Sequence, residues 1–204
     1  LVLFLAVSAV ACSTPDGDQT PDASDGADAG TGPVEPAEFC SGPTSVLYDP
    51  LSKSLNAFPD DFFTVEDAST TTGLKVVLKD GDTITLSNRQ RSAVKSWYDD
   101  LSRLDGFGVT APLFVRFSGA LDPATVPTGA ITASGADGIA IVNLDAEGFE
   151  AVPFEATTVV ESNTDDTVTL VLTPAFPLEP ATRYGLAITN DVKDASGDCL
   201  APSD

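Results

Sequence analysis

The chain of 204 residues is strongly acidic, with 31 Asp and Glu residues against 10 Lys and Arg residues and a net charge of −21. This charge excludes nucleic acid as a partner, because contacts with phosphates require a surplus of basic side chains. The chain contains no histidine, so Ser–His–Asp triads, Cys–His pairs and histidine-dependent metal sites are excluded as well.

The first eleven residues form an unbroken run of apolar and small side chains that ends at Cys12. The run is too short to span a bilayer, which takes roughly 20 apolar residues, and it fits the apolar part of an export signal. Ala9-Val10-Ala11-Cys12 resembles the lipobox of bacterial lipoproteins, in which the cysteine is diacylated and becomes the mature N-terminus. The resemblance implies that residues 1–12 end in a lipidated Cys12, that the membrane is a partner through this lipid anchor, and that Ser13 favours the outer membrane or cell surface. The alternative is an ordinary cleaved export signal with an incidental cysteine.

Residues 13–38 are rich in Asp, Gly, Ala, Pro and Thr and contain no aromatic residue. Such a segment cannot bury enough apolar surface to offset the entropy of ordering it, so we predict a disordered acidic tether. Asp22, Asp25 and Asp28 are spaced as in calcium loops, but the glutamate that an EF-hand needs at its twelfth position is missing.

Cys40 and Cys199 stand near the two ends of the remaining segment. In an oxidising compartment, two such cysteines predict a disulfide that closes a long loop. Two buried free thiols, or partners beyond Asp204, are the alternatives. A zinc site is disfavoured, because thiols are few and imidazoles are absent.

An N-terminal extension is expected over 39–112, and its first feature is a hairpin. Leu74–Leu78 and Thr83–Leu86 are short apolar or β-branched runs on either side of Asp80-Gly81. Asp-Gly between two such runs is a strong hairpin signal, because glycine accepts positive φ angles.

Apolar residues then recur at spacings of three and four, which predicts one amphipathic helix over 88–104. The repeating residues are Val94, Trp97, Tyr98, Leu101 and Leu104. Trp97 is expected to anchor this helix in the core, and carbohydrate stacking is the alternative role.

The residues after Gly108 have the pattern of short strands separated by turns rich in Gly, Pro, Asp and Asn. Several strands at this spacing predict a two-sheet antiparallel sandwich over 113–204. The expected strands are 113–117, 130–133, 139–142, 157–161 (a weaker signal), 167–172 and 184–189.

Three stretches carry a family resemblance over about 113–198. Val115–Pro123 is similar to the opening strand of the SbsA-type bacterial Ig-like domains, Leu172–Tyr184 to their proline-rich corner, and Asp191–Gly197 to their closing turn. The resemblance implies an Ig-like domain in the second half of the chain.

A narrower resemblance covers the first half of the chain. Asp49-Pro50, Phe58–Phe62 and Leu104–Pro112 look like the N-terminal region of bacterial virulence-factor lipases, which are exported lipoproteins. This resemblance implies an accessory segment that precedes an α/β-hydrolase domain beyond Asp204.

The last turn contains Asp191, Asp194 and Asp198, which are the candidate ligands for a calcium ion, since hard cations bind several oxygens from close loops. Asp194, Gly197 and Asp198 also suit a tight turn. Tyr184 follows a proline corner, so its hydroxyl is expected to bond nearby backbone as in a tyrosine corner. We favour these structural roles over ligand contacts, and no other cofactor is indicated.

Catalytic motifs are missing from the sequence. It contains no G-x-S-x-G elbow, no P-loop and no dinucleotide fingerprint. Asp60-Asp61, Asp99-Asp100 and Asp165-Asp166 are adjacent carboxylates that leave a glycosidase-type pair as the remaining option. We interpret these pairs as exposed acidic turns and expect no enzymatic activity.

Together these observations predict a mainly β protein, in which an Ig-like antiparallel sandwich carries an N-terminal extension with a hairpin and one α-helix. The predicted function is a non-catalytic, surface-anchored lipoprotein module that is structural or adhesive, or that presents a downstream domain or meets a cell-surface partner. The alternative is the accessory domain of a lipase or esterase. A glycan binder would need exposed aromatic residues on one sheet face, whereas most of the eleven phenylalanines are expected in the core.

Overall fold

The computed structural model describes most of the chain after Cys40. The described residues are 2–6, 40–49, 57–77, 97, 100–127, 131–132, 138–160 and 166–203. The predicted lipidation of Cys12, the predicted tether over 13–38 and the second hairpin strand predicted at 83–86 lie outside them.

The larger of two main sheets contains six strands in the order β2-β6-β11-β10-β7, with β3 also paired to β6. All of these pairings are antiparallel. The strands are β2 (Val46–Leu47), β3 (Ala57–Phe58), β6 (Leu113–Phe117), β7 (Ile131–Thr132), β10 (Phe154–Val160) and β11 (Val168–Pro174).

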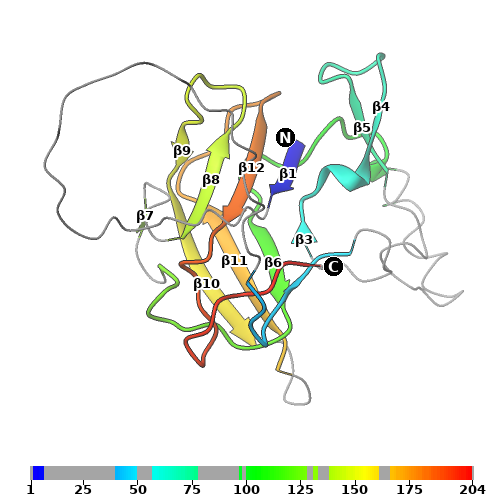
Figure 1. The fold of residues 1–204 in the computed structure, drawn as a ribbon. Helices are drawn as coiled ribbons and strands as arrows, with labels where there is room; N and C mark the ends of the chain where they lie inside the picture. Colours follow the sequence, from blue (N-terminus) through cyan, green and yellow to red (C-terminus); the bar gives the residue numbers. More distant parts are fainter. Residues whose placement is uncertain are drawn as a thin grey trace, which may run out of the picture.

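The second main sheet has the order β1-β12-β8-β9. Its strands are β1 (Val2–Ala6), β8 (Ile139–Asn143), β9 (Ala151–Val152) and β12 (Arg183–Ile188). β12 pairs antiparallel with β8 and β8 with β9, while β1 runs parallel to β12. The two sheets lie one behind the other (Figure 1), so the predicted mainly β fold with antiparallel sheets is confirmed, and the arrangement is consistent with an Ig-like sandwich.

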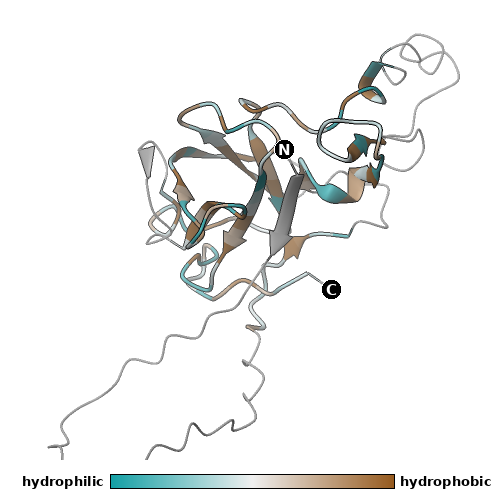
Figure 2. Cartoon of the chain, turned by 90° about the horizontal axis from the view of Figure 1, so that it is seen from above, coloured by the Kyte–Doolittle hydropathy of each residue, from teal (hydrophilic) through white to brown (hydrophobic). Residues whose placement is uncertain are grey.

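The core lies between the inner faces of these sheets, and strand periodicity explains it. In β6, Leu113, Val115 and Phe117 are buried while the residues between them are partly exposed, as the alternation of side chains along a strand requires. Ile139 and Ile141 in β8 follow the same pattern. Hydrophilic residues are frequent in the loops around the sandwich (Figure 2). The strands predicted in this half of the chain are therefore confirmed, with β10 longer than its weak signal indicated.

The hairpin predicted at 74–86 is confirmed only in its first strand. β5 (Leu74–Val76) exists, but in the described residues it pairs with the preceding strand β4 (Thr64–Glu66). This small sheet stands to one side of the sandwich (Figure 1). A single 3-10 turn, η1 (Asp61–Phe63), comes directly before β4.

No α-helix is found among the elements whose bounds lie in the described part of the chain. Of the helix predicted over 88–104, the structure describes only Trp97 and the residues from Asp100 onward. The backbone is helical at Trp97, Asp100 and Leu101. The expected anchoring role of Trp97 is wrong, because 67% of its surface is exposed. Leu101 and Leu104 are 37% and 44% exposed, so these two described residues of the apolar stripe are not buried in the core.

Candidate functional site

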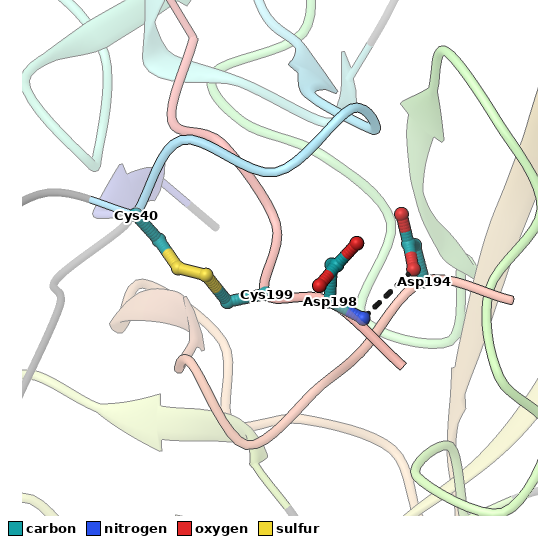
Figure 3. Close-up of a disulfide and its surroundings, with 4 residues drawn as sticks. All are labelled: Cys40, Asp194, Asp198 and Cys199. Atoms are coloured by element: carbon teal, nitrogen blue, oxygen red, sulfur yellow. Dashed lines mark hydrogen bonds between the residues drawn. A yellow bond between two sulfur atoms is a disulfide. The ribbon is translucent and has the colours of Figure 1, made fainter. Parts of the chain in front are cut away.

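Cys40 and Cys199, which stand near the two ends of the segment 39–204, are joined by a disulfide (Figure 3). Their Cα atoms are 5.9 Å apart, a separation typical of disulfides. Next to this bond, Ala201 donates its N–H to the carbonyl of Thr44 at 2.8 Å and accepts from the N–H of Val46 at 3.2 Å. The last residues of the chain are thus fixed beside β2 by both covalent and hydrogen bonds.

Asp194 organises the turn that precedes Cys199. Its side chain is 2% exposed, and its Oδ1 atom accepts hydrogen bonds from the backbone N–H of Ser196 at 2.8 Å and of Asp198 at 3.0 Å (Figure 3). Gly197 adopts a φ of 86°, which favours glycine. The predicted tight turn is therefore confirmed, and the carboxylate of Asp194 serves the backbone.

The calcium candidates do not converge in the structure. Asp191 lies near the hydroxyl of Thr189, which contacts its carboxylate at 3.2 Å, while Asp194 points into the turn. Among the described residues, which include Asp191, Asp194 and Asp198, no three Asp, Glu or Cys side chains are grouped as a metal site requires.

Tyr184 forms the predicted tyrosine corner. The ring is buried at 2% exposure, and its hydroxyl oxygen accepts a hydrogen bond from the backbone N–H of Glu179 at 3.0 Å. The bond holds the proline-rich segment against the start of β12.

Replacing Tyr184 by Phe should lower the free energy of unfolding by about 1 kcal/mol, because one hydrogen bond is lost while the packing of the ring is kept. Urea unfolding of the wild type and the Tyr184→Phe variant measures this difference. The slope with urea should stay the same, since the buried surface does not change. Equal stability of the two proteins would show that the corner does not depend on this bond.

An acidic cluster that the sequence did not reveal lies at the start of η1. Asp60 is only 3% exposed, so the interpretation of Asp60-Asp61 as an exposed turn is wrong for this residue. Its Oδ1 atom accepts from the N–H of Phe62 at 2.9 Å and caps the turn. The side chains of Tyr48 and Asp61 are also hydrogen-bonded to Asp60.

These contacts change the acidity of both neighbours of Asp60. Burial is the main cause that raises the pKa of Asp61 from 3.8 to about 6, and the hydrogen bond and negative charge of Asp60 act in the same direction. Burial, and then the hydrogen bond to Asp60, raise the pKa of the Tyr48 phenol above its ordinary value. Asp60 thus caps η1 and at the same time accepts hydrogen bonds from the side chains around it.

The proton on Asp61 should make stability depend on pH. Because the pKa of this carboxyl is about 6 in the folded protein and near 3.8 in the unfolded chain, the folded state retains a proton that the unfolded state loses. This contribution is complete below about pH 4 and is lost as the pH rises through about 6. An Asp61→Asn variant, whose neutral amide can donate to Asp60 at any pH, should keep more of its stability at neutral pH.

Urea unfolding at several pH values between about 4 and 7.5 tests this expectation. The matched control is Asp166→Asn, the same change at an exposed aspartate. The expectation fails if Asp61→Asn and Asp166→Asn show the same dependence on pH.

The comparisons with known proteins agree with this architecture. A sequence profile of the bacterial Ig-like domain family matches residues 103–204, which is half of the chain. This chain belongs to that family. The match begins at Arg103, before the first strand of the predicted sandwich, and the SbsA-type resemblance of the second half is confirmed. Neither the curated proteins nor the solved structures contain a match.

The Ig-like match does not extend over residues 39–102, so the resemblance of this part to virulence-factor lipases stays a prediction. In the segments that the structure describes, none of the helices has the length and apolar character needed to cross a bilayer.

Proposed function

We propose that this chain is a non-catalytic module of the bacterial cell surface, attached by lipid on Cys12 and carried on an acidic tether. Cleavage before Cys12 would remove β1 from the edge of the second sheet and leave the pairings of β12 with β8 and of β8 with β9 in place. The Ig-like domain then serves a structural or adhesive role, or presents a domain that follows it. Bacterial Ig-like domains are typically found in surface-exposed proteins, and the family match is the observation that carries the proposal.

The buried polar groups of the described residues serve the fold. Among the described residues, every buried side-chain nitrogen or oxygen has a hydrogen-bond partner. Asp194 binds turn N–H groups, Asp60 caps η1, and Tyr184 closes a corner. These side chains hold turns and a corner of the fold, as buried polar groups in folded proteins usually do.

The lipid anchor can be tested by expressing the chain in a Gram-negative bacterium with a start Met and basic residues added before Leu1. Mass spectrometry should find an acylated Cys12 as the N-terminal residue, and the protein should sediment with outer membranes. The Cys12→Ala variant should remain unacylated. An unmodified Cys12 in a soluble, cleaved wild-type protein would support the ordinary export signal.

The absence of catalysis is tested on the purified chain with a p-nitrophenyl ester and a p-nitrophenyl glycoside. We expect no turnover above the rate in buffer. Hydrolysis of either compound that survives repurification would overturn the proposal that this chain is non-catalytic.

A further inference from the structure

A pocket of about 160 Å³ lies beside the tyrosine corner, and none of the structural roles described above accounts for it. Its walls are formed by the end of β8, by residues 150–153 around β9, and by residues 176–179 together with Tyr184. The apolar part of the lining includes Val152, Phe176 and Leu178.

The charges at this pocket all have the same sign. Glu150 and Glu179 belong to the lining and are both exposed, and no Lys or Arg lines it. The nearest basic side chain along the chain, Arg183, is paired with Asp145, since its Nη2 atom lies 2.6 Å from Oδ1 of that carboxylate. The pocket therefore has two carboxylates without a cationic partner among its lining residues.

An aromatic ring that lines the pocket is exposed to solvent. Phe176 lines it and is 68% exposed, although a phenylalanine side chain gains free energy by leaving water. A cation held over an aromatic face gains electrostatic energy from the ring. The combination of apolar wall, exposed ring and carboxylates is complementary to an alkyl chain that ends in a positive charge.

Backbone strain is found on both sides of the same pocket. Within the described residues, only Phe149 and Ala181 are non-glycine residues with positive φ, and both have a φ of 53°. Phe149 directly precedes Glu150, and Ala181 lies between Glu179 and Tyr184. Strained residues of this kind are enriched at ligand-binding sites.

We propose that this pocket binds the side chain of a lysine on a partner protein. The four methylene groups would lie along Val152, Leu178 and the ring of Phe176, and the ammonium group would meet the carboxylates of Glu150 and Glu179. The net charge of −21 attracts a basic partner at long range and adds to this local complementarity. The inference rests on the pocket itself and holds whether or not the chain carries a lipid.

The test is an NMR titration of the isotope-labelled chain with the peptide acetyl-Ala-Lys-Ala-amide. Methyl resonances of Val152 and Leu178 should shift and saturate with a dissociation constant on the order of 1 mM, as expected for so few contacting atoms. Two further peptides separate the contribution of the alkyl chain from that of the positive charge. In one the lysine is replaced by norleucine, which keeps the alkyl chain without the charge, and in the other the lysine is acetylated. Both should bind at least about fivefold more weakly, a factor that corresponds to the loss of one exposed charge pair.

Variants locate the site. Glu150→Gln combined with Glu179→Gln should weaken lysine binding about tenfold, and Phe176→Ala should weaken it as well, while the fold stays intact because all three side chains are exposed. Glu155→Gln is the matched control, since Glu155 is an exposed glutamate on β10 and does not line the pocket. The proposal is overturned if no saturable shift occurs, if norleucine binds as tightly as lysine, or if Glu155→Gln weakens binding as much as the double variant.

Discussion

Replacing both Cys40 and Cys199 by Ala should lower the free energy of unfolding by about 5 kcal/mol. The two cysteines are 159 residues apart, so the bond removes much of the conformational freedom of the unfolded chain. Domains of this size are stable by only about 5–15 kcal/mol, so the variant should unfold at a much lower urea concentration.

Urea unfolding of the wild type, oxidised and reduced, and of the Cys40→Ala/Cys199→Ala variant measures the effect. Cys12→Ala is the control that removes a cysteine without removing the bond. We expect reduction to destabilise the wild type and the Cys12→Ala variant to the same extent. If the double variant and the oxidised wild type unfold at the same urea concentration, the bond does not stabilise the domain.

Truncating Phe117 to Ala should cost about 3–5 kcal/mol. This ring is fully buried in β6, and its residue pairs with Val46 of β2 on one side and Val168 of β11 on the other. Truncation leaves a cavity in the core between the two sheets, and the close-packed surroundings relax only partly to fill it.

The matched control for this prediction is Phe176→Ala, because Phe176 is 68% exposed and its loss should change stability by no more than about 0.5 kcal/mol. If Phe117→Ala does not fold, Phe117→Leu removes fewer atoms and should lower the free energy of unfolding by about 1 kcal/mol. Equal stabilities of the two alanine variants would contradict the placement of Phe117 in the core.

The second half of the fold could be predicted because its signals are local. Strands that face a core on one side alternate apolar and polar residues, and β6 accordingly has the bounds predicted for it. Turn and corner contacts join residues that are close in sequence. Tyr184 meets Glu179, and Asp194 meets Ser196 and Asp198.

The structure of the first half was harder to predict, because a local sequence pattern does not show which partner an element pairs with or whether another element covers it. The apolar stripe around Trp97 predicts a helix face but does not show whether another element covers it, and Trp97 is in fact exposed. β5 pairs with β4, although the Asp-Gly signal pointed to a partner on its other side. Asp60 is buried with Tyr48, twelve residues earlier, so the acidity of its neighbour Asp61 could not be inferred from the sequence.

The disulfide also decides how the molecule carries mechanical load. A pull applied at Cys40 and at the residues that follow Cys199 passes through the one covalent bond between these cysteines. The strands between these cysteines lie outside the loaded path and are not peeled apart. Under such a pull, the oxidised segment between Cys40 and Cys199 should not lengthen. After reduction, the same segment should lengthen as its strands unfold.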